Sequence, residues 1–192
     1  IGIADRNSVA GVVRAHVAWR DVRAQMPDFR LVVGARLVFA DDTPDMVAYP
    51  MTRFGWGRLT RLLTLGNRRA VKGDCILYFE DLLEYADDIA FIALPLRAFA
   101  SLRESAQNSH AKTQRHEEEC LRQLKAKTPH LWIGATMPRG GTDARKLAEL
   151  AELSAATGIP LIATNDALYA TLEARALHDI VTCIREGTTI QS

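Results

Sequence analysis

The chain opens with Ile1-Gly2-Ile3-Ala4-Asp5-Arg6-Asn7-Ser8-Val9-Ala10-Gly11, in which an apolar run turns into a helix through polar residues. Residues 1–4 are typical of the end of a buried strand. The polar residues 5–7 then stand at its carboxyl end, where parallel sheets and barrels carry their sites. We expect Asn7 or Ser8 to cap the following helix by accepting from its first free backbone N–H groups. This stretch therefore predicts an α/β protein with a candidate site at its first turn.

Strand and helix patterns alternate along the rest of the chain. Runs dense in apolar and β-branched residues predict strands at residues 30–39, 46–49, 88–94, 130–135 and 159–166. Helical spacing of apolar residues predicts helices at residues 8–26, 52–67, 79–86, 96–127 (broken near 107–109) and 142–157. Gly66-Asn67 and Gly158 suit helix C-caps. The alternation predicts an α/β architecture.

Composition predicts one soluble domain, residues 1–192, with 48% hydrophobic and 24% charged residues. A net charge of +1 gives no general attraction to nucleic acid or to an anionic membrane. No apolar run approaches the roughly 18 to 20 residues of a membrane span. Three widely spaced cysteines fit a reducing cytoplasm and argue against a disulfide framework or a zinc site. The chain starts without Met inside a predicted strand, so we expect it to be a piece of a longer protein.

Three segments carry a resemblance to a known family. Residues 2–15 resemble the second motif of the PHP (polymerase and histidinol phosphatase) domain, in the version found in bacterial error-prone, DnaE-type (ImuC) DNA polymerases, which are relatives of the C-family polymerase III alpha subunit. Residues 33–36 resemble the family's Gly-x-Glu segment. Residues 160–169, with the helix around residues 178–185, resemble its last motif. The resemblance implies a distorted seven-stranded (β/α) barrel, here without its first strand and helix.

The resemblance also implies a vestigial metal site at Asp5, Arg6, Arg36, Asp166 and Leu168. Catalytic members have a metal-binding His at the position of Arg6, a Glu at that of Arg36, and Asp-x-His at residues 166–168. A guanidinium stays protonated and has no lone pair to donate, so it cannot ligate a cation. We expect no metal in this chain, and we hypothesise that Arg6 and Arg36 converge with Asp5 and Asp166 as a salt-bridged plug. The family's first motif, His-x-His, lies outside this sequence.

The function implied is that of a non-catalytic structural PHP domain in an error-prone DNA polymerase. The parent chain would be a DNA-directed DNA polymerase, a Mg-dependent nucleotidyltransferase of DNA replication and repair, acting in translesion synthesis and damage-induced mutagenesis. We expect no cofactor in the fragment itself and little catalysis by it alone. Its expected partners are the rest of the polymerase chain and, through the parent enzyme, DNA, with no membrane and a cytoplasmic location.

Two alternatives remain open. One is an active metal-dependent PHP phosphoesterase or 3′–5′ exonuclease. The other is a DNA- or protein-binding module that uses the basic stretch Arg53, Arg58, Arg61, Arg68 and Arg69, although arginines lying over apolar neighbours on a solvated helix face explain the same pattern. His116 and Cys120, four residues apart on one helix, have no matching pair elsewhere and are not favoured as metal ligands.

Overall fold

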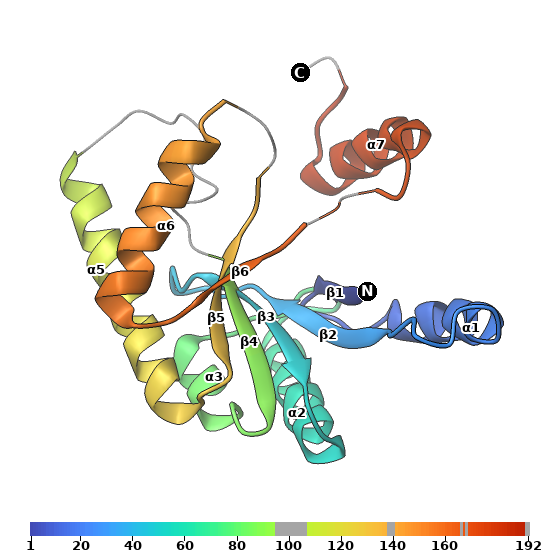
Figure 1. The fold of residues 1–192 in the computed structure, drawn as a ribbon, viewed down its shortest axis with the longest axis horizontal. Coiled ribbons are helices and arrows are strands. Elements are labelled where there is room, and N and C mark those ends of the chain that lie inside the picture. Colours follow the sequence, from blue (N-terminus) through green and yellow to red (C-terminus); the bar gives the residue numbers. More distant parts are fainter. Residues whose placement is uncertain (95–106, 138–140, 166, 168, 191–192) are drawn as a thin grey trace.

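The computed structural model describes residues 1–94, 107–137, 141–165, 167 and 169–190, which form a six-stranded sheet flanked by helices (Figure 1). The strands are β1 (Gly2–Arg6), β2 (Val32–Leu37), β3 (Asp45–Pro50), β4 (Ile89–Leu94), β5 (Leu131–Ala135) and β6 (Leu161–Ala163). They lie in the sheet in the order in which they occur in the sequence. Strand β3 is antiparallel to both of its neighbours, and the other pairs are parallel.

The helices are α1 (Val12–Arg23), α2 (Arg53–Arg69), α3 (Phe79–Glu84), α5 (Gln107–Lys127), α6 (Asp143–Thr157) and α7 (Arg175–Glu186), with a short 3₁₀ turn, η1 (Leu172–Ala174), before α7. The predicted α/β class is confirmed. The expected seven-stranded barrel would have six strands without its first strand, and the described residues form six strands. Part of the helical region predicted at residues 96–127 lies outside the described residues.

The main hydrophobic cluster of the described residues lies on one face of the sheet, and Leu94 is also buried on the other face. Leu37, Met46, Phe91 and Ile133 project from the face of the main cluster and are fully buried. Helices α2, α3, α5 and α6 cover it with Leu59, Leu62, Leu82, Leu121, Leu124, Leu150 and Leu153. Side chains alternate between the faces of a strand, so the intervening residues, such as Arg36 and Trp132, lie on the opposite face and are only partly buried. This second face is the one that can carry polar chemistry.

Helix α1 differs from its prediction. It begins at Val12 rather than near Ser8, and none of its residues is buried. Its apolar residues therefore form no core stripe, although their spacing predicts one. Similarly, among the described residues of the strand predicted at 159–166, only Leu161–Ala163 form a strand.

The two predicted glycine C-caps have different outcomes. Gly158 ends α6 in the left-handed conformation, with φ of 65°, as expected. Gly66 does not end α2, which continues to Arg69. Gly66 is instead buried where a Cβ would lie 2.6 Å from the Cys75 sulfur and 2.6 Å from a Leu77 methyl group. Its small size allows the following segment to pack closely on the helix.

The start of α2 also depends on a close approach. The Thr52 hydroxyl accepts from the Gly55 backbone N–H at 3.1 Å and donates to Asp88 at 2.8 Å. A Cβ on Gly55 would lie 2.1 Å from the Asp88 carbonyl oxygen, which is backbone and cannot rotate away.

We expect Gly55→Ala to lower the free energy of unfolding by about 1–3 kcal/mol, because the helix must shift away from the Asp88 backbone, directly before β4. The matched control is Gly57→Ala in the same helix, where a Cβ meets nothing within 4 Å. That substitution should be neutral or stabilise by up to about 1 kcal/mol through helix propensity. Denaturant unfolding checks both variants, and equal effects would contradict the close-approach account.

The end of α2 is tied to α3 by one ion pair. Arg69 binds both carboxylate oxygens of Asp81, with 2.8 Å between Arg69 Nη2 and Asp81 Oδ1. Asp81 Oδ2 also accepts from the Tyr78 backbone N–H at 3.0 Å, which caps the start of α3. The Arg69 hydrogen bond holds the pKa of Asp81 below its usual value of 3.8.

The contribution of Asp81 to stability should therefore depend on pH. It is fully present above the pKa of the unfolded chain and is lost as pH falls from about 4 through the lower folded pKa. We expect Asp81→Asn to be less stable than the parent protein at pH 7 and to lose less further stability on acidification. Asp87→Asn, at a side chain 65% exposed, should change stability by less than about 0.5 kcal/mol. Denaturant unfolding between pH 7 and pH 2 measures the free energy of unfolding of the parent and both variants. If all three lost the same free energy on acidification, the proposed role of Asp81 would be excluded.

Candidate functional site

The candidate site lies where β1 and β2 end. Arg6 and Arg36 are direct partners in the parallel register of these strands, so two of the predicted positions are neighbours. Asp5 precedes Arg6 on β1 and, by strand alternation, projects to the other face. There its Oδ2 accepts from the Gly11 backbone N–H at 2.6 Å, immediately before α1. Asp5 therefore supports the start of the helix and does not meet Arg36.

Arg36 forms an ion pair across the hairpin between β2 and β3. Its Nε lies 2.8 Å from Asp45 Oδ2, and the two side chains are 31% and 25% exposed. Arg36 is opposite Val47 in the antiparallel register, which places Asp45, two residues before Val47, diagonally across on the same face. Asp45 lies one residue before the strand predicted at residues 46–49, although in the structure it begins β3. The signal that could have identified this pair is an arginine near the end of one strand and an acidic residue at the start of the next, with a short hairpin between them.

Asn7 does not cap a helix, contrary to the prediction. It has a positive φ of 46°, which asparagine tolerates better than most residues. Its backbone N–H donates to the Arg36 carbonyl at 2.8 Å. Its side chain accepts from the Val38 N–H at 2.8 Å and donates to the Val38 carbonyl at 3.0 Å. The amide thus continues the β1–β2 ladder past the end of the strands.

Ser8, the other predicted cap, also plays a different part. Its hydroxyl accepts from the Ala10 N–H at 3.1 Å, within the turn that precedes α1. The residue at the N-cap position of α1 is Gly11, which has no side chain with which to cap the helix. The backbone donor of Gly11 is satisfied from outside the helix by Asp5, and this explains how α1 starts without a conventional cap.

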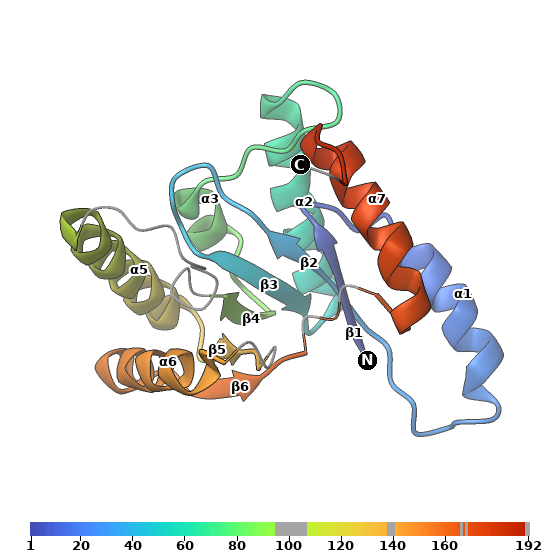
Figure 2. The ribbon, with the colours of Figure 1, turned by 90° about the horizontal axis from the view of Figure 1, so that it is seen from above.

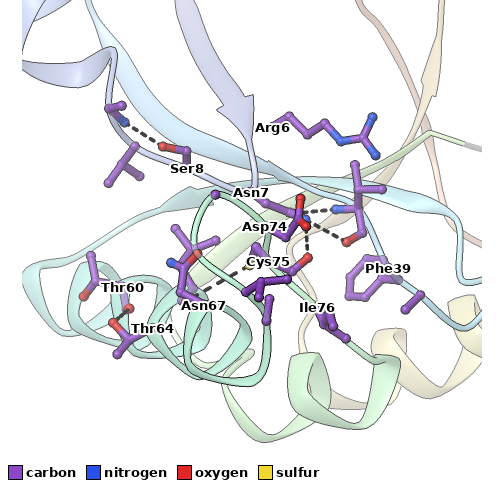
Figure 3. A pocket seen from close by; sticks show the side chains of 18 residues that line it. Arg6, Asn7, Ser8, Phe39, Thr60, Thr64, Asn67, Asp74, Cys75 and Ile76 are labelled. Atoms are coloured by element: carbon purple, nitrogen blue, oxygen red, sulfur yellow. Dashed lines mark hydrogen bonds between the residues drawn. The ribbon is translucent and has the colours of Figure 1, made fainter. Parts of the chain in front are cut away.

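A cavity of about 830 Å³ opens beside this turn (Figure 3). It lies between the β1–α1 turn, the end of β2, helix α2 and residues 70–76. Phe39 and Leu63 contribute apolar surface, while Arg6 and Asn67 are polar residues of the lining. Cys75 also lines the cavity, and burial raises the pKa of its thiol, so it is not an activated nucleophile.

The described residues do not fit a PHP-type metal centre. No group of three or more His, Cys, Asp or Glu among them is placed to hold an ion. Asp45 is neutralised by Arg36, and a guanidinium at that position would repel a cation. Asp166 and Leu168 lie outside the described residues, so the hypothesis that Asp166 completes a plug with Arg6 and Arg36 stays a prediction.

The basic stretch of α2 is not a single free surface. Arg58 bonds Asp87 at 2.9 Å and lies 4.9 Å from the centre of the Tyr85 ring. Arg69 is held by Asp81. The other three predicted DNA contacts are exposed; they are Arg53, Arg61 and Arg68.

The His116–Cys120 pair is confirmed as a contact, with 3.6 Å between Nε2 and Sγ. Burial raises the pKa of the Cys120 thiol to about 11, which opposes formation of the thiolate that binds metals. No helix in the described part of the chain is long and apolar enough to cross a membrane.

Fold and site together define an α/β domain in which two neighbouring strands end in adjacent arginines, Arg6 and Arg36. No family model matches the chain. Error-prone DNA polymerases of Sinorhizobium medicae, Brucella abortus and Caulobacter vibrioides are 44%, 42% and 37% identical to it over 99–100% of its length. The chain spans 16% of the length of each. A solved structure, of a putative metal-dependent phosphoesterase from Bifidobacterium adolescentis, has a TM-score of 0.47 and 12% identity, covering 85% of this chain and 74% of that one.

The resemblance to error-prone DNA polymerases found in the sequence is therefore confirmed. Along nearly its whole length, this chain is related to one segment of the error-prone DNA polymerases.

We expect Asn7→Ala to lower the free energy of unfolding by about 1–3 kcal/mol, because the backbone groups of Val38 lose their partner. Asn7→Gly removes the same hydrogen bonds but accepts the positive φ, so the difference between the two variants isolates the backbone conformation. Ser8→Ala, in the same turn, should cost less than Asn7→Ala. Denaturant unfolding compares all three, and a larger loss in Ser8→Ala would show that Asn7 is not the main clamp.

Proposed function

We propose that this chain is a non-catalytic structural PHP domain of an error-prone DNA polymerase. The observation that carries the proposal is the Arg36–Asp45 ion pair, which puts a fixed cation where the family resemblance requires a metal-bridging carboxylate. Arg6, its neighbour in register, replaces a ligand imidazole with a second fixed cation. These guanidinium groups can neutralise nearby carboxylates, but they supply neither a Lewis acid nor a metal-bound nucleophile.

The proposed role is to stabilise the polymerase. An ion pair that joins β2 to β3 and an asparagine that joins β1 to β2 hold the sheet edge together without a metal. A partly buried pair of this kind contributes to stability when both partners are present, because removal of one would leave the other charge unpaired. The domain would thus offer a rigid body to the rest of the enzyme.

The whole enzyme is proposed to be a DNA-directed DNA polymerase that acts in replication and repair of damaged DNA, including translesion synthesis and mutagenesis, in the cytoplasm. Support comes from the names of relatives that match along nearly all of this chain. Its Mg²⁺ ions and most DNA contacts would belong to parts of the polymerase outside this segment. DNA binding by the basic stretch of α2 is less favoured, since Arg58 and Arg69 are engaged within the domain.

The rival function, a metal-dependent phosphoesterase or 3′–5′ exonuclease, predicts a filled metal cluster. We expect the full-length polymerase, purified without chelator, to contain no stoichiometric Zn, Mn or Fe by mass spectrometry. We also expect no excision of a mismatched primer terminus and the same result for Asp166→Ala. A variant that lacks the carboxylates of the polymerase active site serves as the control. Any change to the primer that this variant still makes cannot come from the polymerase active site.

Stoichiometric metal, or excision that disappears in Asp166→Ala, would overturn the non-catalytic proposal. Metal without excision would also do so, because the proposed arginine replacement excludes the cluster itself.

A further inference from the structure

Helix α7 exposes its apolar face. Leu177, Ile180, Val181 and Ile184 recur at the three- and four-residue spacing that brings side chains to one side of a helix. We name these four residues the α7 stripe. They are 65%, 45%, 54% and 76% exposed, respectively. An amphipathic helix in a complete domain normally turns such a stripe toward the core.

Three residues of α7 outside the stripe are partly covered. His178, Thr182 and Cys183 are half-buried, whereas the α7 stripe is exposed. The His178 ring lies against Tyr169, with 5.7 Å between ring centroids. Figure 1 shows the helix standing apart from the sheet, and among the described elements its main contacts are with η1. The orientation is thus the reverse of the one that burial of apolar surface favours for a helix on its own.

More apolar surface lies at the same end of the molecule. Figures 1 and 2 place α1 and α7 at the end away from α5 and α6. On α1, Val13 and Val17 are one turn apart and are 71% and 52% exposed. Leu172, just before α7, is 80% exposed. Exposed apolar side chains gathered at one end of a molecule are typical of a surface that associates with another protein surface.

We propose that the α7 stripe is the surface by which this domain docks on the remainder of its own polymerase chain. This inference rests on the proposed function, because the proposed partner is the rest of that polymerase. The relatives place a segment like this one in chains about six times as long, so most of each relative is available as a covalently attached partner. Covalent attachment gives an effective concentration that a separate protein or a second copy does not have.

The chemistry of the partner surface follows from the stripe. Its four side chains are uncharged and carry no hydrogen-bonding group, so the matching surface must be apolar. The charged residues Arg175 and Asp179 lie outside the α7 stripe, pair with each other at 3.7 Å, and have side chains that are 68% and 49% exposed. They are therefore not needed for docking, and they provide an internal control.

The test is thiol labelling of the full-length polymerase. Leu177→Cys and Ile184→Cys are made singly, with Arg175→Cys as the control outside the α7 stripe on the same helix. A maleimide probe is added to the folded enzyme, and the labelled peptide is identified by mass spectrometry, which separates it from native Cys183. We expect the two stripe thiols to react about tenfold or more slowly than the control, and all three to react alike in denaturant.

Each outcome is decisive. Equal rates at all three positions in the folded enzyme would overturn the proposal. Protection that is lost on dilution would assign the stripe to a second copy and would also overturn it. Concentration-independent protection would support it, even if the metal analysis above found a filled cluster. Conversely, a metal-free, inactive domain with unprotected stripe thiols would leave the proposed function intact and remove only the docking surface.

Discussion

One-sided burial of the sheet is the constraint on which the rest of the structure depends. Four helices cover the face that carries Leu37, Met46, Phe91 and Ile133, and strand alternation then assigns every intervening residue to the other face. A one-residue slip in β2 or β3 would exchange the two sets and bury Arg36 or Asp45 in the core. The hydrophobic effect thus fixes not only the core but also the face on which Arg36 must lie.

On that second face, the charged side chain of Arg36 is paired with a residue of the neighbouring strand. Arg36 forms an ion pair with Asp45 of the adjacent strand, and Asp5, on the other face of its own strand, accepts a hydrogen bond at the start of α1. Asp5 and Asp45 are therefore both engaged in structural contacts within the domain. A polynuclear metal centre requires the reverse, several uncommitted acids and imidazoles converging on one point, with their charge balanced only by the ions.

The sequence predicted most elements because their signals are local: apolar periodicity for α2, α5 and α6, and β-branched density for β2. It also predicted that Arg6 and Arg36 belong together, through the family resemblance. It failed at Asn7, Gly66 and Asp45, whose roles depend on backbone or side chains brought near by the fold. Capping propensity and turn statistics describe what a residue can do for its own neighbours, and these three act on other segments.

The sequential order of the strands has a consequence for how the domain is made. Because each strand pairs with the one synthesised just before it, every new ladder closes a loop of modest length, and none has to wait for a distant terminus. Local pairing of this kind shortens the search for native contacts. A ribosome releasing this segment would therefore allow the sheet to grow strand by strand, with helices α2 and α3 already covering its first half before β5 emerges.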